Sequence, residues 1–568
     1  MRQHLPSSKH NRNIFYENDT KSFKINTDGD SIDWAYSDYW DNTVKSGSQA
    51  VSGGTVLLTV NPGKKGWFKL VITAKQNGNV IASQETSFAV VSNFDLSQVA
   101  DSHFSVQTHA ARTDLIAQDP AALLPIAKKM GVKYVRDALR WEYIEDTTKG
   151  VYNFKDKPFL ENFMSGVKAN DLKPYITLAL YNNLYDEGNA PTSVEARTAF
   201  ANYGKQVLAQ YPQIGQVEIW NEPDIPTFGK GLTTEAEKAD FYFNLLKASY
   251  EQIHPDYPNV KITGFVFGDQ GSDSFLESLY QKGALNYLSE YSFHAYPKNP
   301  EDIVTDINRH RNIMKKYNNN QTIPMNLSET GFTNYNFTEH VQANYVARRI
   351  VTALANGIQK ISIYNLQNKS TDPKDFEGTY GLIRNPGDAK GAYVPKPAFS
   401  AYATMTRELT GADFQTTENV ASGIYVHKFH KEMEDIRVMY APTGATSSYI
   451  PMAALMSRIS WGIRKRIRRR MVMCDCGWMR TRFMSRVGWK LPISKRFQRP
   501  LPIRSLYTMV TTREAIRKST ELVERLPING WRLPYSKAMT AAYRELLRIR
   551  RAHPPNGRRL SSSPDVIE

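Results

Sequence analysis

Between residues 95 and 410, two hydrophobic patterns alternate along the chain. Short segments rich in β-branched and aromatic residues predict strands, and longer stretches with apolar residues every three to four positions predict amphipathic helices. The first helix has strong end signals, with Asp119 as N-cap, Pro120 at its first position and Gly131 after its end. Helices are expected over 119–131, 194–211, 235–253 and 338–357. Strands are expected over 104–110, 134–139, 174–180, 216–222, 260–268, 290–296, 323–329 and 360–366.

Eight strand segments with helices between them are typical of an α/β fold of the (β/α)8 TIM barrel type. We therefore predict such a barrel over residues 95–410 as the catalytic domain. A doubly wound parallel sheet is the alternative. No G-x-G-x-x-G motif follows the first strand, so nothing supports the nucleotide chemistry usual in that fold.

Both flanks of this region have a pattern of strands and turns. Residues 14–92 contain period-two segments separated by Gly, Asn and Pro turns, including Asn77-Gly78, a pair favoured in hairpins. They predict a small N-terminal β-sandwich with an accessory role. Residues 412–448 read as strands again and predict the start of a C-terminal β domain, so that this second β domain is only partial.

The formal net charge of +16 belongs to one end of the chain. Residues 449–568 contain 27 Lys+Arg and 7 Asp+Glu, a net charge of +20, which leaves 45 basic and 49 acidic residues in 1–448, a net charge of −4. The end segment also uses 22 Arg against 5 Lys and contains both cysteines, Cys474 and Cys476. Because the body is near neutral, its charge gives no reason to expect a nucleic acid as its partner.

The Arg-rich tail, residues 449–568, lacks the strand pattern of the segment before it. We interpret it as disordered, or as the product of a shift in reading frame within the second β domain, which would explain the change in composition and pattern together. The alternative is an arm that binds nucleic acid or another anionic polymer, since arginine clusters neutralise phosphates.

Candidate catalytic residues stand where the predicted strands end, because barrel enzymes build their sites from the carboxyl ends of strands. These residues are Arg136 and Trp141 at the second strand, Asn221 and Glu222 at the fourth, His294 and Tyr296 at the sixth, Glu329 at the seventh and Tyr364 at the eighth. Loop aromatics that could stack on sugar faces are Trp141, Tyr181, Tyr185, Phe228 and Tyr335.

Glu222 and Glu329 end strands on opposite sides of the predicted barrel mouth, so their carboxyl groups can converge. Hydrolysis of a glycosidic bond needs such a pair, one protonated to donate to the leaving oxygen and one ionised to attack the anomeric carbon. Arg136 and Tyr296 are expected beside Glu329, where a cation and a phenol would lower its pKa and hold it ionised. Glu222 would then be the carboxyl that stays protonated, through the nearby charge of Glu329.

The stretches VRDALRWEYIEDTTKGVYNF, VEIWNEPD, SFHAYP and LSETGF resemble, in content and order, glycoside hydrolase clan A. They are most similar to family 39 and related bacterial endoglycosidases and β-xylosidases. The resemblance implies that Glu222 is the general acid/base and Glu329 the nucleophile. It also implies that Asn221 binds the sugar and that His294 and Tyr296 line the subsite. Tyr364 stands nearest the position where many members have a sugar-stacking tryptophan.

The resemblance implies a retaining glycosidase that hydrolyses O-glycosyl bonds of a β-linked oligo- or polysaccharide by double displacement. A barrel that binds carbohydrate without cleaving it is the alternative. For single residues, a purely structural role is the alternative. Glu329 would then be only an ion-pair partner of Arg136, and His294, Trp141 and Tyr364 would be ordinary core residues.

The expected partner is a carbohydrate substrate, with no cofactor. No Cys/His cluster has metal-ligand spacing, so no metal is expected. No apolar run reaches about 18 residues, so no transmembrane segment is expected. The first residues lack the apolar region of a signal peptide, although the resemblance suggests an extracellular or cell-envelope location.

Overall fold

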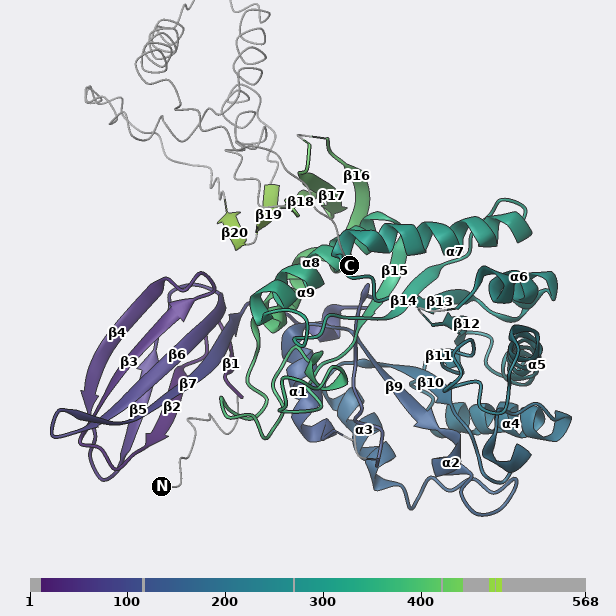
Figure 1. The fold of residues 1–568 in the computed structure, drawn as a ribbon, viewed down its shortest axis with the longest axis horizontal. Helices are drawn as coiled ribbons and strands as arrows, with labels where there is room; N and C mark the ends of the chain where they lie inside the picture. Colours follow the sequence, from purple (N-terminus) through teal and green to yellow (C-terminus); the bar gives the residue numbers. More distant parts are fainter. Residues whose placement is uncertain are drawn as a thin grey trace, which may run out of the picture. The chain divides into compact units, whose positions relative to one another are not determined.

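The computed structural model describes residues 12–114, 118–268, 271–419, 422–442, 469–475 and 477–482 (Figure 1). At its centre, eight parallel strands close into a barrel in the order β8-β9-β10-β11-β12-β13-β14-β15 and back to β8. Their bounds are β8 Phe104–Gln107, β9 Tyr134–Arg140, β10 Lys173–Ala179, β11 Gln216–Ile219, β12 Lys261–Phe267, β13 Glu290–His294, β14 Met325–Thr330 and β15 Ile358–Ile363. The prediction of a (β/α)8 barrel is confirmed.

Helices alternate with these strands and lie outside them, as α4 to α7 show in Figure 1. The sequence signals at the first helix act as expected. The Asp119 side chain accepts a hydrogen bond from the backbone N–H of Ala121, and Gly131 ends the helix with a φ of 88°. The helices are α1 Pro120–Met130, α2 Trp141–Ile144, α3 Pro158–Ala169, α4 Val194–Gln210, α5 Glu235–Ile253, α6 Asp273–Gln281, α7 Ile303–Tyr317, α8 Glu339–Ala355 and α9 Pro397–Leu409. Short 3₁₀ helices occur at Leu96–Gln98, Asp186–Gly188, Ala284–Tyr287, Pro300–Asp302 and Glu377–Thr379.

The N-terminal residues form the predicted β-sandwich. A sheet of order β1-β7-β6-β3-β4 faces the pair β2-β5, and side chains of both sheets share one hydrophobic core that includes Phe23, Phe68 and Phe88. Asn77 and Gly78 both have positive φ, as the tight hairpin between β6 and β7 requires. The strands are β1 Ile14–Tyr16, β2 Lys21–Asn26, β3 Ser31–Asp38, β4 Thr43–Ala50, β5 Thr55–Val60, β6 Gly66–Gln76 and β7 Asn79–Val91.

After the barrel, a five-stranded sheet has the order β16-β17-β18-β19-β20. Its strands are β16 Asp413–Thr417, β17 Tyr425–Lys431, β18 Glu434–Tyr440, β19 Arg469–Asp475 and β20 Gly477–Arg482. The first three confirm the predicted C-terminal β domain. The last two fall within the Arg-rich tail, in a stretch where no strand was expected.

The remaining residues of 449–568 lie outside the described part of the chain, so the interpretations of that segment stay predictions. Among the described residues, no helix combines the length and the apolar composition needed to cross a membrane.

Candidate active site

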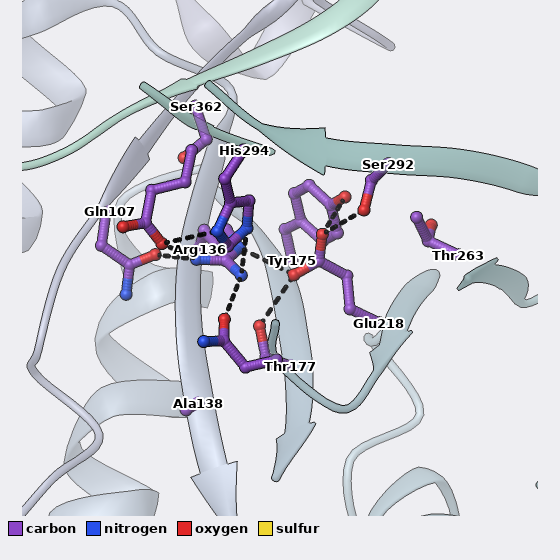
Figure 2. A network of polar contacts seen from close by, with 12 residues as sticks. Gln107, Arg136, Ala138, Tyr175, Thr177, Glu218, Thr263, Ser292, His294 and Ser362 are labelled. Atoms are coloured by element: carbon purple, nitrogen blue, oxygen red, sulfur yellow. Dashed lines mark hydrogen bonds and ion pairs between the residues drawn. The ribbon is translucent and has the colours of Figure 1, made fainter. Parts of the chain in front are cut away.

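The interior of the barrel is polar at the level just below the strand ends. Strand residues alternate between inward and outward positions, and this chain places polar side chains at inward positions of neighbouring strands (Figure 2). The buried polar set consists of Gln107 on β8, Arg136 on β9, Tyr175 and Thr177 on β10, Glu218 on β11, Thr263 on β12 and Ser292 on β13.

Arg136 and Glu218 form a buried ion pair at the centre of this set. Nε of Arg136 donates to Oε2 of Glu218 over 2.7 Å. The hydroxyl groups of Tyr175 and Thr177 donate to the two oxygens of the same carboxylate over 2.8 and 2.9 Å. Burial raises the pKa of Glu218, but the charges of Arg136 and His294 and the hydrogen bonds to the carboxylate together hold this pKa below its ordinary value. The carboxylate therefore stays ionised and its oxygens are satisfied, which a buried charge requires.

The other side of the Arg136 guanidinium faces the strand ends. Nη1 donates to Oε1 of Gln107 over 2.8 Å and to Oε2 of Glu329 over 3.0 Å. Nη2 donates to Oδ1 of Asn221 over 3.2 Å. One planar group thus holds four side chains, from β8, β14 and the β11 segment, in fixed positions.

Glu329 lies near the end of β14 and is held ionised. Tyr296 donates its hydroxyl to Oε1 over 2.6 Å, while Arg136 binds Oε2. Burial raises the pKa of Glu329, but the charges of His294 and Arg136 and the hydrogen bond from Tyr296 together lower it below its ordinary value. The side chain is nevertheless 16% exposed, so this carboxylate can be reached from solvent.

Glu222 stands just beyond β11 on a constrained backbone. Its φ is 44°, in the left-handed region, and its N–H donates to the carbonyl of Val266 on β12 over 3.0 Å. Such a conformation costs free energy and is typically kept at functional positions. The side chain is 15% exposed, close to the value for Glu329.

His294 lies between the two carboxyl groups. Its Nδ1 is 2.7 Å from Oε1 of Glu222 and 3.7 Å from Oε2 of Glu329, so these two oxygens are at most 6.4 Å apart, the sum of those distances. Burial lowers the pKa of His294, but the charges of Glu329 and Glu222 outweigh it and raise this pKa above its ordinary value. His294 is thus hydrogen-bonded to Glu222 and also lies within ion-pair distance of Glu329.

Tyr364, just after β15, also belongs to the cluster. It is 8% exposed, its ring meets Tyr296 edge-on at 6.4 Å between centroids, and its hydroxyl donates to Glu377 over 3.1 Å. Lys369 contacts the same hydroxyl. The structure therefore brings seven predicted residues together: Arg136, Asn221, Glu222, His294, Tyr296, Glu329 and Tyr364.

The prediction that Trp141 binds substrate is wrong. Trp141 is 1% exposed, its ring stacks on Tyr185 at 4.9 Å between centroids, and its indole N–H donates to Glu145 over 2.6 Å. Both the ring and its polar atom are thus occupied by the protein. Tyr185, also expected as a sugar platform, is buried in the same stack.

Glu218 and Gln107 were missed by the sequence analysis although they hold Arg136 in place. A signal for Glu218 was present, because Gln216 and Glu218 alternate with Val217 and Ile219 in QVEIWNE. A carboxylate at an inward strand position needs a buried cation as a partner. Lys369 and Glu377 lie in a long loop with no periodicity, which offers no comparable signal.

No group of three or more His, Cys, Asp or Glu side chains suited to a metal ion occurs among the residues that the structure describes. The cluster instead offers two carboxyl groups in different surroundings. One is bound by a guanidinium and a phenol, and the other by a histidine.

Comparisons with known proteins agree with this picture at the level of the fold. No protein-family model matches the chain, and no curated protein does. A solved family 39 glycoside hydrolase from the gut symbiont Bacteroides cellulosilyticus WH2 matches with a TM-score of 0.63 and 20% identity, over 76% of this chain and 89% of its own. A monomeric β-xylosidase from Caulobacter crescentus CB15 matches with a TM-score of 0.46 and 16% identity, over 58% and 72% of the two chains. The resemblance to family 39 that the motifs indicated is therefore matched by the fold of the chain.

Proposed function

We propose that this protein is a retaining glycosidase that hydrolyses O-glycosyl bonds of β-linked carbohydrate. The observation that carries the proposal is the pair Glu222 and Glu329, partly exposed at the ends of β11 and β14 and linked through His294. Their surroundings differ in the way that the two roles in glycoside hydrolysis demand. The fold shared with a family 39 glycoside hydrolase supports the same activity.

Glu329 is suited to be the nucleophile. A nucleophilic carboxylate must be ionised before the substrate binds, and the lowered pKa of Glu329 provides this. Burial and the charge of Glu329 also raise the pKa of Tyr296, so the phenol stays protonated and keeps donating its hydrogen bond. Arg136 and Tyr296 together fix the orientation of the carboxylate.

Glu222 is suited to be the general acid and base. Among the described residues, no hydrogen bond or ion pair joins Glu222 to Arg136. Its partner is the ring nitrogen Nδ1 of His294. That hydrogen bond orients the carboxyl group toward Glu329. Its partial exposure allows the carboxyl group to exchange its proton with solvent between catalytic cycles.

The separation of the two carboxyl groups favours retention of configuration. Retaining enzymes have carboxyl groups about 5–5.5 Å apart, whereas inverting enzymes need about 6.5–9.5 Å to admit a water between them. The limit of 6.4 Å, set by 2.7 and 3.7 Å to His294, applies to one oxygen of each group, and it brings Oε1 of Glu222 and Oε2 of Glu329 closer together than the inverting range.

The reaction then has two steps. Glu329 attacks the anomeric carbon while the bond to the leaving oxygen breaks and Glu222 gives that oxygen its proton, which leaves a glycosyl ester on Glu329. Water next attacks the same carbon, Glu222 takes a proton from the attacking water, and Glu329 departs as a carboxylate. One water is consumed, and two inversions restore the starting configuration.

Asn221 is positioned to bind a sugar hydroxyl next to the reacting carbon. Its Oδ1 accepts from Arg136, so the amide presents its N–H donors to other partners. Hydrogen bonds to the hydroxyl beside the anomeric carbon strengthen in the transition state of glycosidases.

Replacing either carboxyl group tests the two assignments. On p-nitrophenyl β-D-xyloside and β-D-glucoside, we expect Glu329→Gln to lower kcat/KM by at least about 10²-fold, because the ester no longer forms. We expect Glu222→Gln to lower kcat by at least about 10²-fold, because hydrolysis of the ester loses its general base. Azide should restore turnover in Glu222→Ala and release a β-glycosyl azide, because it replaces water on the ester step. Glu195→Gln is the control, because this carboxyl group on α4 is 66% exposed and pairs with Lys149. Unchanged activity in either glutamine variant would reject the role given to that residue.

The lowered pKa of Glu329 predicts a pH profile. Activity should persist as pH falls below the ordinary carboxyl range and be lost only as pH falls through this lowered pKa. In Tyr296→Phe the missing hydrogen bond should raise the pKa of Glu329, so the acidic limb of kcat/KM should move to higher pH. Tyr280→Phe is the matched control, since the buried Tyr280 hydroxyl has no hydrogen-bond partner among the residues that the structure describes. An unmoved acidic limb in Tyr296→Phe would contradict the role given to the Tyr296 hydrogen bond.

Glu218 should matter without touching substrate. Glu218→Gln removes the buried counter-charge of Arg136, so we expect a loss of about 3–5 kcal/mol in the free energy of unfolding together with reduced kcat. Urea unfolding and steady-state kinetics measure both effects. Glu195→Gln breaks the exposed pair with Lys149 and should cost at most about 1 kcal/mol. Equal effects of the two variants would show that the buried pair has no special role.

A further inference from the structure

Two aromatic side chains stand exposed on the same face of the barrel as the proposed catalytic pair. Tyr335 follows β14, the strand that carries Glu329, and Phe376 lies in the loop after β15. Tyr335 is 53% exposed and Phe376 is 45% exposed. Their rings meet edge-on, with 5.8 Å between the ring centroids. We call these two residues the aromatic pair. Two exposed aromatic groups in contact with each other call for an explanation.

The aromatic pair is held rigidly from below. The buried hydroxyl groups of Thr333 and Thr379 lie 2.6 Å apart and join the two loops. The Thr333 hydroxyl also donates to the carbonyl of Phe376 over 2.8 Å, and the backbone N–H of Tyr335 donates to Thr379 Oγ1 over 3.1 Å. Buried polar links of this kind fix a single loop conformation, so the two rings are presented before any ligand arrives.

An unbroken series of ring contacts connects the aromatic pair to Glu329. Phe376 meets Tyr380 at 5.6 Å, and Tyr380 meets Tyr296 at 5.9 Å between centroids. Tyr296 donates to Glu329. The pair is therefore the outer end of a series of packed rings, which passes through the buried Tyr380 and whose inner end, Tyr296, contacts the proposed nucleophile.

We propose that the aromatic pair is a distal sugar-binding subsite, and that the substrate is consequently a chain of several β-linked sugars. This rests on the proposed glycosidase function. The ring faces carry negative charge density, which attracts the polarised C–H groups on the face of a pyranose, while exposed polar residues beside them can bind hydroxyl groups. Those neighbours are Asn336, Lys374 and Glu377.

A carbohydrate fits the aromatic pair better than a protein partner. The apolar surface is limited to two rings with polar neighbours, whereas a stable protein interface needs a larger contiguous apolar centre. Continuity with the nucleophile further favours a ligand that also enters the catalytic site.

Chain length provides the first test. With p-nitrophenyl β-glycosides of one to four sugar units, wild-type kcat/KM should rise with length. Tyr335→Ala and Phe376→Ala should each lower kcat/KM on the longest substrate by about 3- to 10-fold and leave the single-sugar substrate within about twofold. Tyr335→Phe, which keeps the ring, should behave as wild type. Tyr425→Ala removes a partly exposed ring that stacks on Tyr440 in the C-terminal sheet, and it is the control.

Binding without turnover provides the second test. In affinity electrophoresis, the Glu222→Gln variant should be retarded by gels that contain at least one of soluble xylan, mixed-linkage β-glucan or mannan. The double variant Glu222→Gln/Tyr335→Ala should lose that retardation. Equal losses on short and long substrates, or unchanged retardation, would overturn the subsite while leaving the glycosidase proposal intact. Absence of hydrolysis by wild type would instead overturn the proposed function. Retardation that Tyr425→Ala removes equally would also contradict the subsite.

Discussion

The buried ion pair between Arg136 and Glu218 is the interaction on which the rest of the site depends. A carboxylate inside the barrel is tolerated because Arg136, Tyr175 and Thr177 satisfy its oxygens. In return, Glu218 balances the charge of the guanidinium and fixes the orientation of its plane. The other guanidinium nitrogens donate to Asn221 and Glu329. The polar interior therefore costs the barrel some stability, and in exchange the guanidinium of Arg136 is a fixed hydrogen-bond donor beneath the strand ends.

From that donor follows the difference between the two carboxyl groups. Glu329 receives hydrogen bonds from a cation and a phenol. Burial raises the pKa of Glu329, but the charges of His294 and Arg136 and the hydrogen bond from Tyr296 together lower it. Glu222, on a left-handed backbone beyond β11, is bound by His294 instead. Two identical side chains thus have different surroundings, because Arg136 and Tyr296 donate hydrogen bonds to Glu329 whereas Glu222 is bound by His294.

The fold could be predicted, and the two carboxyl groups that we propose to react could be located, because both depend on local patterns. Strand and helix periodicity gave the barrel, and polar residues at strand ends gave Glu222 and Glu329. Trp141 was misjudged because an aromatic residue after a strand has the same pattern whether it faces solvent or, as here, stacks on Tyr185. The contact between Tyr335 and Phe376 was beyond prediction, since it joins two irregular loops through Thr333 and Thr379.

The central claim is that Glu329 forms a covalent bond to the sugar. Reaction with a 2-deoxy-2-fluoro β-glycoside carrying a good leaving group should slow release of the ester and let it accumulate, because fluorine destabilises the transition state of both steps while the leaving group speeds only the first. Mass spectrometry of the digested protein should then show the peptide containing Glu329 heavier by one fluorosugar. A label on Glu222, or none on an enzyme that is turning over the parent glycoside, would contradict the account.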